Sequence, residues 1–465
     1  MRRTPLTIVL PIVLLYCAFL TRTYYWDGVL FALNIESARE PGASMAALMH
    51  PNHLLYSNLG YIAYWAAVRS GLPLRAITVL QLVNVLASTL LAYFVFKFMK
   101  RLSASNRLAS AACVLFAFGA TWWKFSTDAD AYILSVLLLS IAVGLAGERK
   151  SVLAGITHAA AMLMHQLAIF GVMPILVAIL IYRRTAASFA GYLAAAAIPV
   201  AAAYALAYRT VDQRVYPTLL SWVASSSSQS QTTHSFTQLF PTNLVSYLKL
   251  FAGGRWSLLQ QFLSPVVYIS LACSICLLAY GVWLWFRPPA NPSVVYDYRI
   301  PVVLVAWLLP YIVFLSWFEP GNAFYKLFIW PPIVLLVSFA LRQHASALLA
   351  FALALTTWNF GVFIFPHSHV RADPVLELAE KIDRELPRNA TVYYREFVPD
   401  DWYMRYFAPG RDWNQLPVKQ KTTPGPVCFE TTALDVVHVP ESSKMRWDLV
   451  NDRHNVKLEC LPDKR

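Results

Sequence analysis

Asp27 follows the first apolar run of the chain and is the side chain best suited by position to acid–base chemistry. It lies in residues 24–28, whose tyrosines and tryptophan are typical of the lipid headgroup level. A carboxylate at that depth lies close to the lipid headgroups and can act as a general base on a group within hydrogen-bond reach. The other interpretation is a solvated loop residue, or the N-cap of a helix over residues 28–38.

Two further acids, Asp128 and Asp130, lie two residues apart where one apolar run ends and the next begins. Two carboxylates in one turn can hold a divalent cation or orient hydroxyl groups of an acceptor. Either residue could instead cap a helix that starts near Ala131, and both uses are compatible in different members of the pair. A divalent cation is therefore the one cofactor that the sequence suggests, and its identity stays open.

His50 and His165 are the histidines that could contribute to the same site. His50 and His53 flank Pro51, which can open a helix, and His165 lies in a short hairpin between two apolar runs. A histidine there could contact a polar substrate or could be a hydrogen-bonded interface residue. Two histidines without a fixed third ligand are a weak signal for a metal.

Cations that could bind a phosphate follow later in the chain. Lys326 ends the turn that begins at Glu319, and it could bind a lipid phosphate or extend to the headgroups. Arg255 belongs to the long loop over residues 209–263, where it could pair with a bound lipid or with bulk headgroups.

The composition requires a membrane to position these residues. Of the 465 residues, 58% are hydrophobic and 14% charged, which excludes a disordered, coiled-coil, collagenous or ordinary cytosolic protein. Residues 371–465 carry 15 basic and 16 acidic side chains, so the net charge of +13 belongs to residues 1–370. Basic flanks of membrane spans account for that charge, and we expect no nucleic-acid partner.

Eleven apolar runs are long enough to predict membrane spans. The predicted spans are residues 5–21, 76–96, 108–123, 131–147, 152–165, 167–182, 187–208, 264–286, 300–318, 327–342 and 345–366. We interpret residues 54–68, which mix aromatic and polar side chains, as a helix in the membrane interface. The first run lacks a cleavage site and is expected to be retained.

The basic residues predict the orientation of these spans. They concentrate in the short loops that would face the cytoplasm if the N-terminus does, as the positive-inside rule requires. Eleven spans then place the C-terminal segment outside the cytoplasm. Seven of the nine acids of residues 1–370 fall on that outer side, which predicts a polar cavity opening outward: Asp27, Glu36, Glu40, Asp128, Asp130, Asp212 and Glu319.

Residues 367–465 read as a small soluble α/β domain outside the membrane, after a membrane domain over residues 1–366. The pattern predicts a helix over residues 374–386 and strands over 390–394, 428–431 and 434–437. A unit of this size is marginal alone and should dock on the membrane domain. Cys428 and Cys460 could form a disulfide bond if the domain is extracytoplasmic.

The order of these motifs resembles the GT-C superfamily of membrane glycosyltransferases, nearest to its protein O-mannosyltransferase and aminoarabinose-transferase branch. The family has a first span, an outer loop that starts with an acid, interfacial helices with a His-Pro-Pro-Leu motif, and a Gly and an Arg before the second span. This sequence has the corresponding segments at residues 26–28, 50–54 and 71–75, then Thr127-Asp128, and Lys326-Leu327 at a late span. It departs from the pattern at Gly28, where the family has a second acid, and at Asn52.

The resemblance implies an α-helical polytopic fold with interfacial helices in the first outer loop. It also implies an inverting transferase that moves a sugar from a polyprenyl-phosphate donor to a lipid, glycan or protein acceptor hydroxyl. We expect the inner membrane of a bacterium, because the loops are short and no eukaryotic retention signal is found. Asp27 would be the catalytic base, Lys326, Arg255 and Arg75 would bind the donor phosphate, and Asp128 and Asp130 would orient the acceptor or an ion. The alternatives are a transporter or flippase of a lipid-linked sugar, and a non-catalytic relative.

Overall fold

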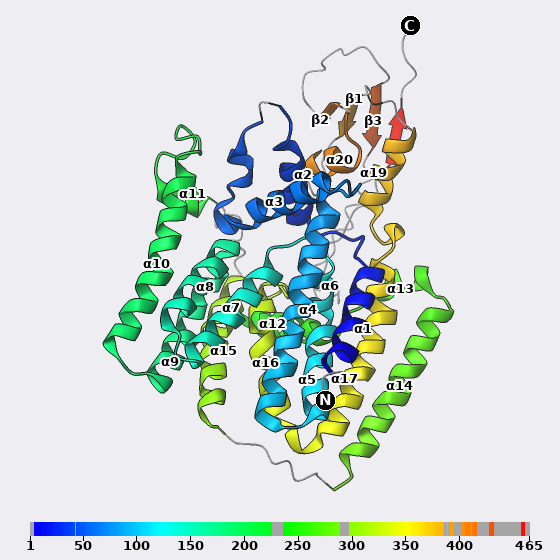
Figure 1. The fold of residues 1–465 in the computed structure, drawn as a ribbon. Helices are drawn as coiled ribbons and strands as arrows, with labels where there is room; N and C mark the ends of the chain where they lie inside the picture. Colours follow the sequence, from blue (N-terminus) through cyan, green and yellow to red (C-terminus); the bar gives the residue numbers. More distant parts are fainter. Residues whose placement is uncertain are drawn as a thin grey trace.

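The structure, a computed structural model, describes residues 4–41, 43–225, 236–288, 297–385, 388, 391–394, 401–410, 412–415, 427–431 and 457–460. Most of these residues form helices (Figure 1). Those of the first half are α1 (Thr4–Ala18), α2 (Trp26–Ser37), α3 (Tyr56–Arg69), α4 (Ala76–Ser103), α5 (Asn106–Phe118), α6 (Ala120–Ser126), α7 (Tyr132–Gly147), α8 (Ser151–Met164), α9 (Val172–Tyr182) and α10 (Ala186–Tyr208). Those of the second half are α11 (Leu219–Ala224), α12 (Phe236–Phe251), α13 (Trp256–Leu259), α14 (Pro265–Trp285), α15 (Arg299–Phe318), α16 (Trp330–Ala340), α17 (Ala345–Asn359), α18 (Phe365–His367), α19 (Pro374–Glu385) and α20 (Asp401–Phe407).

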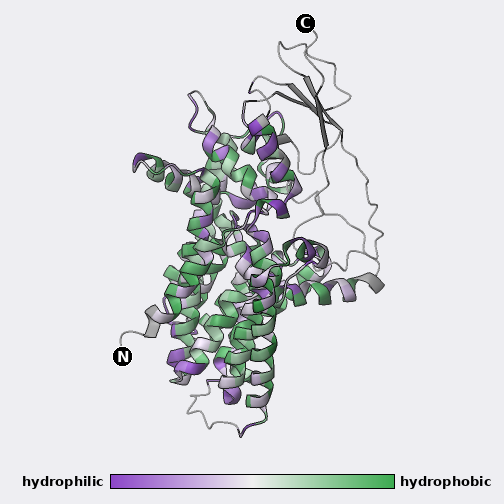
Figure 2. Cartoon of the chain, turned by 90° about the vertical axis from the view of Figure 1, so that its right-hand side faces the viewer, coloured by the Kyte–Doolittle hydropathy of each residue, from purple (hydrophilic) through white to green (hydrophobic). Residues whose placement is uncertain are grey.

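Five helical segments of the described residues are long and apolar enough to cross a membrane: Ala76–Ser103, Ala186–Tyr208, Pro265–Trp285, Arg299–Phe318 and Arg342–His367. Shorter apolar helices over Thr7–Ala18, Tyr132–Gly147, Ser151–Met164, Gln166–Tyr182 and Tyr325–Ala340 lie among them. The chain is therefore a multi-pass membrane protein, and hydrophobic residues dominate its long helices in Figure 2.

The predicted span over residues 108–123 is a pair of helices, α5 and α6, bent by 67° at Gly119. A Cβ atom at Gly119 would lie 2.3 Å from the Trp330 side chain and 2.9 Å from the Leu250 carbonyl oxygen. Only glycine permits this close approach, and the bend turns the Thr127–Asp130 segment toward α4. Apolar periodicity does not reveal such a break, because both halves of the pair are apolar.

The first long loop folds over one end of the bundle as α2 and α3 (Figure 1). Helix α3, which corresponds to the interfacial helix expected over residues 54–68, buries Tyr56, Ser57 and Gly60 and exposes Ile62 and Trp65. It packs against α2 and α4.

The C-terminal segment adds two helices and a four-stranded sheet of order β2-β1-β3-β4. The strands are β1 (Thr391–Tyr394), β2 (Asp412–Gln415), β3 (Val427–Thr431) and β4 (Lys457–Cys460). β1 is parallel to β2 and to β3, and antiparallel β4 places Cys460 opposite Cys428. The strand predicted over residues 434–437 lies outside the described residues.

Helix α20 packs against α2, helix α19 packs against α20, and the three helices share a core. The apolar face of α19, with Val375, Leu376, Ala379 and Ile382, is buried in this core. The C-terminal segment therefore contacts the helix that carries Asp27.

Candidate functional site

A ladder of buried polar side chains on α4 holds the turn that carries the acid pair. Gln81 donates to the carbonyl oxygens of Thr21 and Thr127, at 2.9 and 2.8 Å. Asn84 donates to the carbonyl oxygens of Asp128 and Asp130, at 2.8 and 2.7 Å. Polar groups buried in an apolar bundle are stable only when hydrogen-bonded, so this ladder fixes the position of the turn.

Asp128 is fully engaged inside that turn. Its carboxylate forms a buried ion pair with Lys124 and accepts hydrogen bonds from the backbone N–H groups of Tyr25, at 2.9 Å, and Ala129, at 2.8 Å. Both charged side chains are almost completely buried. A carboxylate with these donors joins the turn to the chain segment just before α2.

Asp27 lies in the first turn of α2 and is half-buried. Its side chain has no hydrogen-bond partner among the described residues. Burial raises its pKa from 3.8 to about 6, which brings the carboxylate close to the range of an efficient base at neutral pH.

Asp130 lies beyond the same turn and is 1% exposed. Its Oδ1 atom accepts a long hydrogen bond of 3.4 Å from the backbone N–H of Tyr132. Its pKa is raised well above the usual value by burial, and further by the charges of Asp27 and Asp128. The structure thus brings Asp27, Asp128 and Asp130 together around the start of α2.

Aromatic rings connect these acids to the turn before the next apolar helix. The rings of Tyr25 and Phe324 are 4.7 Å apart, and Tyr132 lies 5.5 Å from Phe324 and 5.8 Å from Tyr325. Phe324 and Tyr325 are half-buried. Such faces can stack against an apolar face of a sugar ring.

Lys326 follows these rings in the 3-10 helix Tyr325–Ile329 and is completely buried. Its ammonium donates to Ser246, to the Pro320 carbonyl oxygen at 2.7 Å and to Asn243 Oδ1 at 3.1 Å. The charge of Glu319 acts on Lys326 from a greater distance, and the charge of Lys249 opposes it. Within the described part of the chain, no carboxylate forms an ion pair with Lys326, so its charge is held by neutral acceptors.

The histidines form a separate row that ends at Tyr132. The rings of His50 and His53 are 5.4 Å apart, those of His53 and His165 4.6 Å, and those of His165 and Tyr132 4.4 Å. Burial lowers the pKa of His165 to about 3, and also lowers the pKa values of His50 and His53. All three rings are therefore neutral at pH 7. The Nδ1 atoms of His50 and His165 accept backbone N–H groups two residues on, so both histidines cap short helices.

The predicted phosphate-binding arginines lie apart from this group. Arg75 pairs with Glu36 at the far end of α2, at 2.9 Å, and also donates to the Tyr406 carbonyl oxygen of α20. Tyr406 in turn donates to Glu36 at 3.0 Å. Arg255 precedes α13 and donates to Ser257. Arg75 thus links α2, α4 and the C-terminal segment.

The described residues contain no group of three His, Cys, Asp or Glu side chains that could hold a metal ion. Asp128 is engaged with an ammonium and two N–H groups, so Asp130 is the member of the pair with a free oxygen atom. This donor set does not fit a divalent ion, which prefers six or more oxygen ligands. The predicted cation stays a prediction.

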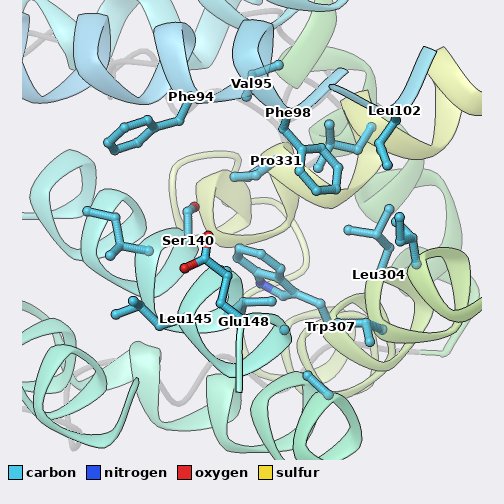
Figure 3. Close-up of a pocket in the computed structure, with 18 of the residues that line it drawn as sticks. Phe94, Val95, Phe98, Leu102, Ser140, Leu145, Glu148, Leu304, Trp307 and Pro331 are labelled. Carbon is cyan, nitrogen blue, oxygen red and sulfur yellow. The ribbon is translucent and has the colours of Figure 1, made fainter. Parts of the chain in front are cut away.

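A cavity of about 610 Å³ lies at the other end of α4 and α7 (Figure 3). Its lining is mostly apolar, with Phe94, Phe98 and Trp307, and includes Ser140 and Glu148. The acid turn is held by Gln81 and Asn84 near the N-terminal end of α4, whereas the cavity is lined by residues 91–102 near its C-terminal end. It is therefore distinct from the acid cluster.

Sequence reasoning missed Gln81, Asn84 and Lys124 as parts of the site. Gln81, Asn84 and Ser88 are buried polar residues at helical spacing inside an apolar run, and that spacing was the available signal. Lys124 lies four residues before Asp128, a spacing typical of a helical ion pair.

No family model and no curated protein sequence matches the chain. The crystal structure of ArnT from Cupriavidus metallidurans bound to undecaprenyl phosphate matches with a TM-score of 0.64 at 10% identity, over 100% of this chain and 99% of that one. The structure of the same protein in the apo state matches with a TM-score of 0.54 at 11% identity, over 98% and 97%. The chain therefore shares the fold of ArnT along its whole length, as expected from the resemblance.

Proposed function

We propose that this protein is an inverting membrane glycosyltransferase that moves a sugar from a polyprenyl-phosphate donor to an acceptor hydroxyl. The observation that carries the proposal is the arrangement around Tyr25 and Phe324. Asp27, a half-buried carboxylate without a hydrogen-bond partner among the described residues, follows Tyr25 by two residues, and a buried ammonium, Lys326, follows Phe324 by two residues. General-base catalysis and phosphate binding need this combination of charges.

The donor class is suggested by the charge of Lys326 and by the fold. A buried cation held only by neutral acceptors favours an anionic ligand, because a charge without a counterion is costly inside a protein. The structural neighbour ArnT binds undecaprenyl phosphate. We assign the donor phosphate to Lys326 before Arg255 and Arg75, since Arg75 is already paired with Glu36.

The reaction follows from these assignments. Asp27 takes the proton of the acceptor hydroxyl as its oxygen forms a bond to the anomeric carbon. The bond from that carbon to the phosphate oxygen breaks, and the electron pair stays on the phosphate, near Lys326. Because the hydroxyl attacks opposite the leaving group, one displacement inverts the anomeric carbon. His50 and His165, from the row of histidines, and Asp128 and Asp130, from the acid turn, would orient the acceptor.

The same proposal includes a topology. The five long spans, the α5–α6 pair and the five shorter apolar helices together correspond to the eleven predicted spans. If all eleven helices cross the membrane and the N-terminus is cytoplasmic, Asp27 and the C-terminal domain lie on the outer face of a bacterial inner membrane.

A transport assay separates this function from that of a flippase. Purified protein in liposomes is given a short-chain polyprenyl phosphate that carries a radiolabelled sugar, together with a mixture of candidate acceptors. A transferase forms labelled acceptor and releases polyprenyl phosphate. Movement of the intact donor between leaflets, without a labelled product, would instead support the flippase and contradict our proposal.

A further inference from the structure

The first turn of α2 is in direct contact with the turn that carries Asp130. A Cβ atom on Gly28 would lie only 1.9 Å from the Ala129 carbonyl oxygen. The backbone of α2 therefore rests on the backbone of the acid turn, with no space for a side chain at position 28. Position 28 is where the resemblance places a second acid, and in this fold the segment that occupies that space carries Asp130 instead.

Three buried oxygen atoms near this contact have no hydrogen-bond partner in the described part of the chain: Asp130 Oδ2, Asn84 Oδ1 and Tyr56 OH. The three atoms belong to neighbouring residues. Asn84 donates a hydrogen bond to the Asp130 carbonyl oxygen, and Tyr56 is close enough to interact with the Asn84 side chain and with the charge of Asp130. Leaving such an atom unpaired in the core is unfavourable. The set contains two acceptors and only one donor, the Tyr56 hydroxyl, so it is one hydrogen-bond donor short.

A proton on Asp130 Oδ2 would supply this donor and would remove a buried charge. Asp130 has no ion pair among the described residues, in contrast to Asp128 with Lys124. Asp27 lies within electrostatic reach of Asp130, and no hydrogen bond joins the two carboxyl groups in the described structure. Asp130 is the more buried of the two, so a shared proton favours Asp130 and leaves Asp27 ionised.

We propose that Asp27 and Asp130 form a carboxylate pair that shares one proton, in which Asp130 is a positioning residue that holds this proton while Asp27 is ionised. The proposal rests on the function assigned to Asp27 above. The titratable and charged groups that face the pair are Asp128 with Lys124, and the phenols of Tyr25, Tyr56, Tyr132 and Tyr325. The phenols are neutral at pH 7, and the Asp128 charge is compensated by Lys124. The pair therefore titrates mainly through its own two members.

Infrared spectroscopy of the purified protein tests the pair without any substrate. At pH 8 we expect the wild type to show the carbonyl stretch of one protonated carboxylic acid that Asp130→Asn lacks. The matched control is Asp373→Asn, which changes another fully buried aspartate, bound by Tyr403 and two backbone N–H groups at the start of α19. This control should keep the band.

The pH at which the acid band disappears reports the ionisation of Asp130, and it should move down by ~1 unit in Asp27→Asn, because the like charge of Asp27 has been removed. If Asp130→Asn does not fold, Tyr56→Phe is the second variant, and it should shift the frequency of the acid band. An acid band that is unchanged in Asp130→Asn or Tyr56→Phe, or that disappears at the same pH in Asp27→Asn, would overturn the pair. A coupled titration without any sugar transfer by the wild type would support the pair and contradict the proposed function.

Discussion

The backbone N–H of Tyr25 donates a 2.9 Å hydrogen bond to the Asp128 carboxylate, 103 residues away in the chain. This bond fastens the residue before α2 to the turn between α6 and α7. Since Asp27 comes two residues after Tyr25, its position depends on a buried ion pair in another part of the sequence.

The pH dependence of transfer should follow the ionisation of Asp27. Its raised pKa of about 6 means that the base is mostly protonated at pH 5 and mostly ionised at pH 7.5. We expect kcat/KM to fall about tenfold from pH 7 to pH 5 and to level off above pH 7. An acidic limb with its midpoint near pH 4 would show that the base is not in this environment.

Replacing Lys326 by Met should weaken donor binding while leaving the protein folded. The variant loses the three hydrogen bonds that the buried ammonium donates, which lowers its stability, and the lost charge-assisted bond to phosphate lowers affinity about 10- to 100-fold. Binding of a fluorescent polyprenyl phosphate to the variant and to the wild type measures the change. Arg255→Met, on a residue outside the acid cluster, is the comparison, and equal loss in both variants would argue against Lys326 as the main phosphate ligand.

Asn84→Ala should destabilise the protein. It removes two hydrogen bonds and leaves the carbonyl oxygens of Asp128 and Asp130 unpaired in the core, at a cost of about 2–4 kcal/mol. Thermal unfolding in detergent checks this expectation. Asn34→Ala is a matched control, because Asn34 donates a single 3.2 Å bond at an exposed site and should cost little. Equal midpoints for the two variants would show that the ladder does not stabilise the turn.

Chelation should leave transfer within about twofold of the untreated rate, because the oxygens of Asp128 are already bound and few oxygen ligands remain for a divalent ion. The measurement is the transfer rate after dialysis against EDTA. A large loss that Mg²⁺ or Mn²⁺ restores would contradict this expectation and support the predicted cation.

The apolar pattern predicted helices well but could not predict the contacts between them. Each predicted span has a corresponding apolar helix because burial in lipid leaves a local signal of length and hydropathy. The break at Gly119 left no such signal, since it depends on contact with Trp330, more than 200 residues away. Helix α19 was predictable because its apolar spacing is local.

The candidate site was predictable in residue type rather than in role. The clustering of acids on one side identified Asp27, Asp128 and Asp130, and the structure places these three together. The sequence could not show that Lys124 pairs with Asp128, or that Arg75 is bound to Glu36 and Tyr406, because these outcomes depend on packing between distant segments. Gly28 illustrates the same limit, since its role depends on the backbone of Ala129.

Single-turnover transfer by Asp27→Asn tests the central claim most directly, when donor binding is measured on the same preparation. The amide is close in size to the carboxyl but cannot accept the acceptor's proton, so we predict a rate about 10²- to 10⁴-fold below that of the wild type, with donor affinity unchanged. A variant that binds the donor and transfers the sugar at the wild-type rate would contradict the account.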